Sequence, residues 1–443
     1  MKRSSLAWAL IAVCTSAAAV LRAQDTNETS TAPSDDVAAE LTKLGLSDLE
    51  RGEPPFDASF RLSGFADFAF MGVLVPTDSP WRGSYERYPA FSVGNFNLYL
   101  NKNITAALRM FGEVRLTLLP NGSATADTNL ATGAYASTLV RDYADGRNQL
   151  RWSGISIERV YLEWTLHRLL TLRVGIFLTP YGIWNVDHGS PTIITASRPF
   201  IIGQQLFPTR QTGIEALGQL DLSAHNSLGY HFTVSNGVGA VSDYRDFDAN
   251  KALGGRAYWR YDGFGELLVG GSVFYGTDSS AIEKPSIASD GKHVAYDRQY
   301  TAKSDLLSLA ADVQWKYKGL HVQSELISQQ RRYDERARVG TINPFIGEFL
   351  APMDRLSLGA YALVGYRFDW FGVMPYALWQ FLDTGELFTS GRLTLQSFIV
   401  GLNVRPIDAL VFKVELTEVH FPFGFFATED PLRIVQAQIA CAF

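Results

Sequence analysis

The sequence predicts an all-β protein, a transmembrane antiparallel up-and-down β-barrel of about sixteen strands, with fourteen to eighteen compatible with the pattern. Three observations support this. From about Ala58 onward, segments of the chain alternate apolar and polar residues with the period of a β-strand. The connections between these segments alternate between short and long. The last segment alternates too, and it ends on the aromatic residue Phe443.

Composition narrows the class of protein. The chain has 443 residues, of which 47% are hydrophobic, 13% aromatic and only 19% charged. Beyond the N-terminus, no stretch reaches the roughly 18 to 20 continuous apolar residues that a membrane-spanning helix needs. The formal net charge of −6 argues against nucleic-acid binding, because such proteins concentrate Lys and Arg on one face.

The N-terminus has the pattern of a signal peptide over residues 1–23. Lys2 and Arg3 precede a mostly apolar stretch, and the small residue Ala23 stands at the expected cleavage site. A lipoprotein signal centred on Cys14 is the alternative, but Val13 stands where a small residue is expected.

Residues 24–56 are expected to form a periplasmic segment with a short helix, which Ser34 would cap, and residues 57–443 to form the barrel. Removal of the signal peptide would leave Cys441 as the only cysteine, so the mature chain could form no internal disulfide. Closed strand pairing would then have to hold the exported protein together.

The alternation is clearest in four segments, residues 108–118, 170–179, 307–316 and 410–417. In the last of these, Leu410, Phe412, Val414 and Leu416 share one face, while Lys413, Glu415 and Thr417 share the other. A soluble β-sandwich alternates in the same way, so this pattern alone does not decide the fold.

The connections favour a barrel in the outer membrane. Short links are predicted near residues 101–103, 167–168, 224–226, 262–263, 318–319, 369–370 and 406–408. The longer connections between them are predicted at 76–89, 120–153, 181–209, 277–302 and 332–352, with briefer ones near Gly239, Thr384 and Gly424. Outer-membrane barrels have short periplasmic turns and long outer loops, whereas a soluble sandwich has no reason for this asymmetry.

Aromatic residues beside the short links predict a periplasmic girdle, because amphipathic rings favour the headgroup level of the membrane. The girdle residues are Trp164, Trp259, Tyr261, Trp315, Tyr317 and Phe368. In the last segment, Val435, Ile439 and Phe443 share a face, which is typical of the terminal strand that signals insertion by the barrel assembly machinery.

Two adjacent stretches carry a family resemblance. Ile157 to Trp164 reads IERVYLEW, and Leu172 to Gly182 reads LRVGIFLTPYG. Together they resemble a hairpin of the phosphate-selective porin O and P group. The resemblance implies a diffusion pore of sixteen to eighteen strands, often trimeric. That group is similar in lining its channel with lysines, but here only Lys316 and Lys413 fall on polar faces, so phosphate selectivity is not expected.

The polar faces predict a water-filled lumen, since charged groups facing lipid cost several kcal/mol each. Arg109, Arg115, Arg159 and Arg173 come from three consecutive segments and are expected to point inward, as is Glu163. Many of these charges could equally pair across neighbouring strands.

Residues 181–209 are unusually apolar for an outer loop. We expect this loop to fold inward and narrow the pore, with Asp187 facing the arginines. The alternative is that the loop covers the barrel rim or packs against a neighbouring subunit.

These features predict an outer-membrane porin of a Gram-negative bacterium, for passive diffusion of small hydrophilic solutes or ions. The expected partners are membrane lipid, lipopolysaccharide, the barrel assembly machinery and two further copies in a homotrimer, with no nucleic acid and no cofactor. Two alternatives stay open. One is a gated or hydrophobic-substrate barrel, plugged by residues 34–49; the other is a non-conducting structural or adhesion barrel.

No catalytic or metal-binding residue is predicted. Asp187, His188 and Ser190 supply the three residue types of a hydrolase triad, but groups this close in one loop rarely converge as a triad. No Cys pair and no His pair has the spacing of metal ligands.

Overall fold

The computed structural model describes most of the barrel. The described residues are 59–75, 89–119, 124–128, 135–139, 151–186, 189–203, 206–238, 250–287, 294–335, 341–342, 349–350, 353–388, 391–424 and 428–443. The predicted signal peptide, the 24–56 segment with its helix and the 34–49 plug therefore lie outside the described residues. None of the described helices is long and apolar enough to cross a membrane.

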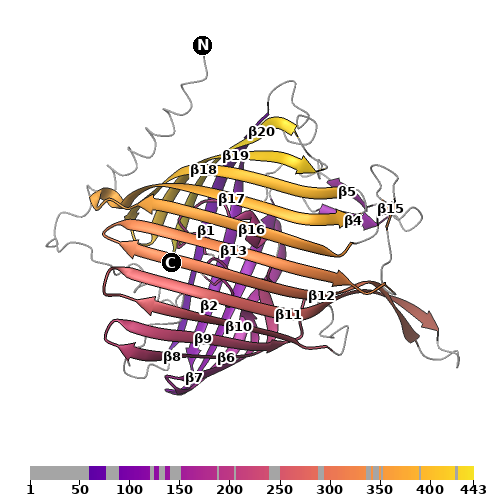
Figure 1. Ribbon diagram of the computed structural model, residues 1–443, viewed down its shortest axis with the longest axis horizontal. Coiled ribbons are helices and arrows are strands. Elements are labelled where there is room, and N and C mark those ends of the chain that lie inside the picture. The colour runs from indigo at the N-terminus through magenta and orange to yellow at the C-terminus, as the bar shows by residue number, and fades with distance from the viewer. Residues whose placement is uncertain are drawn as a thin grey trace, which may run out of the picture.

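Sixteen antiparallel strands close into a barrel, which confirms the predicted fold class and strand number (Figure 1). The strands are β1 (Phe60–Leu74), β2 (Ala90–Asn103), β3 (Leu108–Leu119), β6 (Arg151–His167), β7 (Leu170–Leu178), β8 (Arg210–Ser223), β9 (Asn226–Ser235), β10 (Ala252–Tyr261), β11 (Glu266–Ile287), β12 (Val294–Tyr317), β13 (Leu320–Tyr333), β16 (Arg355–Tyr366), β17 (Val373–Phe388), β18 (Gly391–Ile407), β19 (Leu410–Gly424) and β20 (Thr428–Ala442). Each strand pairs with its neighbours in sequence, as an up-and-down barrel requires.

The barrel closes where the first and last strands pair. The β1–β20 register runs from Phe65 opposite Ala442 to Leu74 opposite Arg433. One residue further, Gly64 and Phe443 exchange two backbone hydrogen bonds, with N···O distances of 2.8 and 2.9 Å. This pairing satisfies the backbone groups that would otherwise form two free edges.

Short turns and longer connections alternate over most of the barrel, as predicted, but only residues 389–390 separate β17 from β18 and only residues 425–427 separate β19 from β20. Two small hairpins stand in the longer connections, β4 (Ala124–Thr128) with β5 (Tyr135–Leu139) and β14 (Thr341–Ile342) with β15 (Phe349–Leu350). They lie at the right of Figure 1, opposite the short turns.

One predicted connection is wrong in kind. Residues 277–302 are largely strand, because β11 and β12 stay paired as far as Ile287 opposite Val294. The turn signals of that stretch lie in a long hairpin rather than in an irregular loop.

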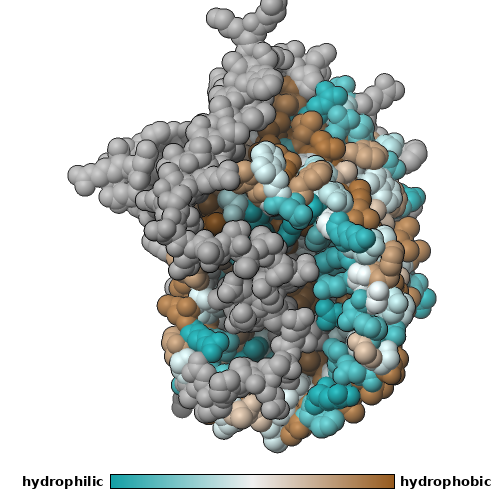
Figure 2. Space-filling model, turned by 90° about the vertical axis from the view of Figure 1, so that its left-hand side faces the viewer, coloured by the Kyte–Doolittle hydropathy of each residue, from teal (hydrophilic) through white to brown (hydrophobic). Residues whose placement is uncertain are grey.

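The two faces of the wall differ as the alternation predicted. On β19, Val414 and Leu416 are exposed on the outside, while Lys413 and Glu415 are buried on the inside. Figure 2 views the end that carries the short turns, where hydrophilic residues border the hydrophobic residues of the outer wall. An apolar outer surface of this kind suits a hydrocarbon environment.

The inside of the barrel is itself divided. The inward side chains of β1 to β10 are mostly polar or charged, whereas those of β16 and β17 are largely apolar. With two residues of β18, they belong to the main hydrophobic core, which includes Tyr361, Leu363, Met374, Leu378 and Ile399. An apolar wall facing water would be unfavourable. The connection between β7 and β8 covers it, and this arrangement positions the candidate site.

Candidate pore constriction

The described residues of the connection 179–209, called the inward loop below, lie inside the barrel. Its apolar residues pack against the inward faces of β11 to β20 in one core. Seven large ones are fully or nearly fully buried: Tyr181, Trp184, Ile193, Ile194, Ile201, Leu206 and Phe207. The prediction that this loop folds into the lumen is confirmed, and the reason is the one predicted, namely that its apolar side chains need cover.

The loop begins with an anchor on β9, the second strand along from β7. The Tyr181 hydroxyl and Thr233 Oγ1 on β9 lie 2.6 Å apart in a hydrogen bond. Burial raises the pKa of Tyr181 well above its ordinary range, so the phenol stays protonated and able to donate. The next residue, Gly182, has a φ of 73°, which favours glycine, and it approaches Glu325 on β13. Ile183 N donates to that carboxylate.

The middle of the loop is bound by polar side chains of β18 and β19. Lys413 Nζ donates to the carbonyl oxygens of Ser190 and Thr195 at 2.6 and 2.9 Å. Glu415 accepts hydrogen bonds from the backbone of Ala196 and Ser197 at 2.6 and 3.1 Å. Asn403 Nδ2 donates to the Ile194 carbonyl at 2.9 Å. Backbone groups of a non-helical, non-strand segment are thereby satisfied away from water.

A short helix, α3 (Phe200–Gly203), continues the loop. Phe200 N donates to Gln380 Oε1 on β17 at 2.8 Å. Beyond the helix, the Leu206 carbonyl accepts from Ser308 Oγ at 2.6 Å and Gln329 Nε2 at 2.8 Å. The loop is therefore held along the described part of its length by inward-facing residues of β9, β12, β13, β17, β18 and β19.

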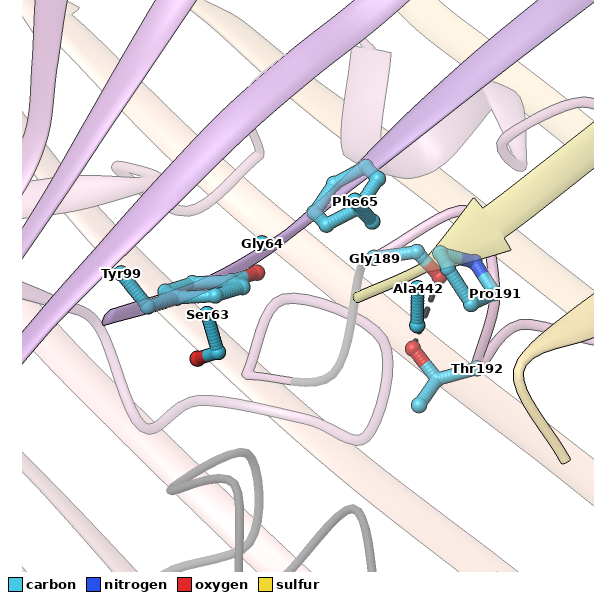
Figure 3. A pocket seen from close by; sticks show the side chains of 8 residues that line it. All are labelled: Ser63, Gly64, Phe65, Tyr99, Gly189, Pro191, Thr192 and Ala442. Atoms are coloured by element: carbon cyan, nitrogen blue, oxygen red, sulfur yellow. Dashed lines mark hydrogen bonds between the residues drawn. The ribbon is translucent and has the colours of Figure 1, made fainter. Parts of the chain in front are cut away.

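The loop also reaches the seam of the barrel. Ser190 Oγ donates to Asp67 on β1, and Asn95 Nδ2 on β2 donates to the same carboxylate at 2.7 Å. A small cavity lies between this turn and the ends of β1 and β20 (Figure 3). Phe65 and Tyr99 line it from the wall, and Thr192 lines it from the loop, where its hydroxyl donates to the Gly189 carbonyl at 2.7 Å. The loop thus spans the lumen between opposite walls.

The polar half of the wall carries a buried ladder of charges. Arg173 Nε lies 2.7 Å from Glu163, and its Nη1 lies 3.1 Å from Glu215. Arg109 flanks Glu163 at 3.7 Å, and His231 Nδ1 lies 2.8 Å from Glu215. Alternating charges therefore run across β3, β6, β7 and β8, and His231 on β9 stands at the end of this row.

A second pair, Arg159 with Glu113 at 2.7 Å, lies beside the ladder. Aromatic rings pack against these guanidinium groups. Arg159 lies over the rings of Tyr99 and Phe111, and Arg173 lies over Tyr161. Stacking on aromatic faces suits the flat, weakly hydrated guanidinium group and helps to cover it.

These pairs change the interpretation of the predicted arginine wall. All four arginines point inward, but Arg159, Arg173 and Glu163 are only 5 to 6% exposed and cannot form much of the lumen surface. Of the six predicted constriction residues, Arg109 and Arg115 retain substantial exposure. The prediction for Asp187 concerns a residue outside the described part of the chain.

A β-bulge adds a residue that the alternation did not predict. Opposite β3, the register steps from Arg159 to Ile157 and skips Glu158, so Glu158 and Arg159 both point inward. Glu158 then lies between two strands' arginines: Arg210 Nη2 is 2.7 Å away and Arg115 Nη1 is 3.7 Å away.

The inward loop brings a third arginine to this place. The side chain of Arg198 is exposed, and the charges that act on it are those of Arg115, Arg210, Glu158 and Asp67. The charges of three arginines and two carboxylates therefore act on one another at this place in the lumen. We call Arg115, Glu158, Arg198 and Arg210 the constriction cluster.

Sequence reasoning missed Glu158, Arg198 and Arg210 as members of a site. The two-residue alternation of a strand does not reveal where a bulge inserts an extra residue. Arg210 directly follows the predicted loop 181–209. The part of the wall that the loop covers could have been predicted, because segments 358–364 and 374–382 are apolar on both faces. A strand with two apolar faces needs cover on both sides.

The residues predicted to form the girdle lie near short turns. Trp259 and Tyr261 stack with ring centroids 5.8 Å apart beside one short turn, and Trp315 and Tyr317 stack at 5.9 Å beside the next. Trp164 and Phe368 are about half exposed near two further short turns, and Ile439 and Phe443 are exposed on the outer wall. Their roles as headgroup anchors and insertion signal stay predictions.

The described residues contain no group of three or more His, Cys, Asp or Glu that could hold a metal ion. Of the residues that resembled a triad, Ser190 is described, and its hydroxyl contacts Asp67 and Asn95.

A closed sixteen-stranded barrel with an internal loop defines a porin-like β-barrel of the outer-membrane type. No protein-family model matches the chain, and no curated protein sequence matches it. Solved structures do. OmpT, an outer membrane protein of Vibrio cholerae, is similar with a TM-score of 0.50 and 9% identity, over 88% of this chain and 99% of that one. An anion-selective porin from Comamonas acidovorans is similar with a TM-score of 0.51 and 10% identity, over 87% and 99%. At this identity the likeness shows the fold, which is that of Gram-negative outer-membrane barrels.

Proposed function

We propose that this protein is an outer-membrane pore through which small hydrophilic solutes or ions diffuse passively, and that it is not an enzyme. A barrel of this strand number is wide enough to hold an aqueous channel. The inward loop removes the apolar half of the inner wall from the lumen, so the remaining lumen surface is polar.

The constriction cluster is the observation that carries this proposal. Arg115, Arg198 and Arg210 retain exposed guanidinium groups in the lumen, although most other inward charges are buried in pairs. Exposed charges inside a membrane protein need water, because a charge in hydrocarbon is costly. Charged side chains arranged around a narrow point of a pore also order water and filter ions.

Planar bilayer recordings of the purified protein test the proposal. We expect stepwise conductance that scales with salt concentration, and we expect swelling of liposomes in small sugars. Absence of both would contradict a pore and favour a structural or adhesion barrel. Conductance that appears only after removal of residues 24–56 would favour a gated barrel with an N-terminal plug.

Assembly and localisation follow the same proposal. We propose membrane lipid and lipopolysaccharide as the surroundings of the outer wall, insertion by the barrel assembly machinery, and a homotrimer as the native state. Mass measurement of the detergent-solubilised protein tests the trimer, since a single-copy mass after mild extraction would contradict it.

A further inference from the structure

Arg198 occupies a position defined by its neighbours on both sides. The two residues before it, Ala196 and Ser197, donate their backbone N–H groups to Glu415. Two residues after it, Phe200 N donates to Gln380. The side chain of Arg198 is exposed, whereas the backbone beside it is bound to the wall.

Glu415 is unusually well suited to hold this backbone. It is 1% exposed, and besides the two N–H groups it accepts from Ser197 Oγ at 2.9 Å and from the Tyr376 hydroxyl at 2.7 Å. Four donors on one carboxylate compensate the cost of taking its charge out of water.

Lys413, two residues earlier on the same inward face, holds the other side of the turn. It is also 1% exposed, and its ammonium group donates to the carbonyl oxygens of Ser190 and Thr195. The wall therefore binds the loop through two opposite charges. The ammonium group of Lys413 binds carbonyl groups of the loop, and the carboxylate of Glu415 binds N–H groups of the loop. These two contacts bracket residues 190–197 and end directly before Arg198.

We propose that Lys413 and Glu415 are positioning residues that set the ion selectivity of the pore by fixing Arg198 in the constriction cluster, and that the solutes so favoured are small anions. This inference rests on the proposed function. Neither Lys413 nor Glu415 touches the solute, because both are buried beneath the loop.

The preference for anions follows from the charges that meet at the cluster. Arg115, Arg198 and Arg210 face Glu158 and Asp67, so positive charge is in excess. Asp67 is covered by Ser190 and Asn95, whereas Arg198 is exposed. The field at the lumen surface is therefore more positive than the count of charges alone indicates.

Reversal potentials in a salt gradient across a planar bilayer test the inference. We expect the anion-to-cation permeability ratio to fall about fivefold in Arg198→Ala, because a unit charge at about 8 Å in water shifts the two ions in opposite directions. Glu415→Gln is expected to lower the ratio as well, although it removes a negative charge. If Glu415 acted only through its own charge, the ratio would rise, so the sign of the change separates the two roles.

The double variant shows whether Glu415 works through Arg198. We expect Arg198→Ala with Glu415→Gln to match Arg198→Ala alone, since an already absent guanidinium group cannot be displaced. Additive changes would overturn the inference. Asp312→Asn is the matched control: it also removes one buried inward carboxylate, which pairs with Arg256 at 2.6 Å, but it lies away from residues 196–198. It should not lower the ratio.

Folding is monitored in every variant by the heat-dependent shift of the barrel on gels. Ser197→Ala removes only the 2.9 Å bond to Glu415 and serves if Glu415→Gln does not fold. It should lower the ratio by a smaller factor, and an unchanged ratio in Ser197→Ala would then refute the inference. A wild-type protein without conductance would instead refute the proposed pore, whereas a conducting wild type with unchanged Glu415→Gln would refute the positioning role alone.

Discussion

The guanidinium group of Arg173 donates a hydrogen bond of 2.7 Å to Glu163, and both side chains are almost completely withdrawn from water. Breaking a buried ion pair is costly because the remaining charge stays buried without its partner. The pair therefore belongs to the framework of the polar wall. Solutes in the lumen would meet the exposed arginines above it.

The first prediction concerns this framework. Arg173→Met should lower the free energy of unfolding by about 3 to 5 kcal/mol, because Glu163 and Glu215 lose their shared cation in a buried setting. Urea unfolding in detergent micelles measures the change. Arg168→Ala is the control, since Arg168 and Asp221 form an exposed pair at 3.1 Å that should contribute about 0 to 1 kcal/mol. Equal effects of the two variants would contradict a structural ladder.

The second prediction concerns the bulged carboxylate. Glu158→Gln should raise the anion-to-cation permeability ratio, because it removes the negative charge that faces Arg115 and Arg210. Reversal potentials measure this. Glu418→Gln provides a control of equal charge, because Glu418 pairs with Arg433 on the outer face of the wall. A lower ratio in Glu158→Gln, or the same rise in both variants, would argue against a selective constriction cluster.

The barrel was predictable because its signals repeat. Each strand such as 170–179 or 410–417 must place apolar residues toward lipid at every second position, so the period survives errors at single residues. The alternation of short and long connections indicated which end of the barrel faces the periplasm. The stretch 277–302 was mispredicted because Asp, Ser and Pro, which usually mark turns, lie here within two strands that remain paired.

The site was less predictable, since its geometry depends on events that the period does not encode. Arg159 and Arg173 were correctly placed on the inner face, but their burial depends on the aromatic rings of Tyr99, Phe111 and Tyr161 and on carboxylates from neighbouring strands. Glu158 points into the barrel because of a β-bulge. The inward loop was predictable from its apolar composition, whereas its attachment to Lys413 and Glu415 required the register of the closed barrel.

The third prediction concerns the start of the inward loop. Gly182 has a φ of 73°, and a Cβ atom there would lie 1.9 Å from Glu325 Oε1. Gly182→Ala should therefore cost about 1 to 2 kcal/mol from the left-handed backbone alone, and it should push Glu325 away from Ile183 N. Unfolding in urea and protease cleavage within residues 179–209 measure the two effects.

Gly203 in the same loop offers a matched comparison. A Cβ atom at Gly203 would meet nothing within 4 Å, so Gly203→Ala should leave both stability and protease resistance close to wild type. If Gly182→Ala were equally neutral, the close approach of the loop to Glu325 would not be a constraint on the folded protein.

The last prediction concerns the end of the chain. Phe443 exchanges two backbone hydrogen bonds with Gly64, and its ring packs on Phe96 with centroids 5.8 Å apart. Deletion of Phe443 should lower the fraction of folded barrel in the membrane several-fold, because it removes both the last closing pair and the aromatic residue predicted to signal insertion. Heat-dependent gel mobility of membrane extracts measures that fraction.

Phe443→Leu separates the two contributions, since it keeps the backbone pair with Gly64 and an apolar side chain but removes the ring. If the assembly machinery reads the aromatic residue, Phe443→Leu should insert poorly in cells and yet refold in detergent as well as wild type. If closure of the seam alone matters, Phe443→Leu should insert normally, and only the deletion should fail. Normal insertion of the deletion variant would show that neither the terminal pair nor the ring limits assembly, and pairing of β1 with β20 from Phe65 to Leu74 would then suffice to close the barrel.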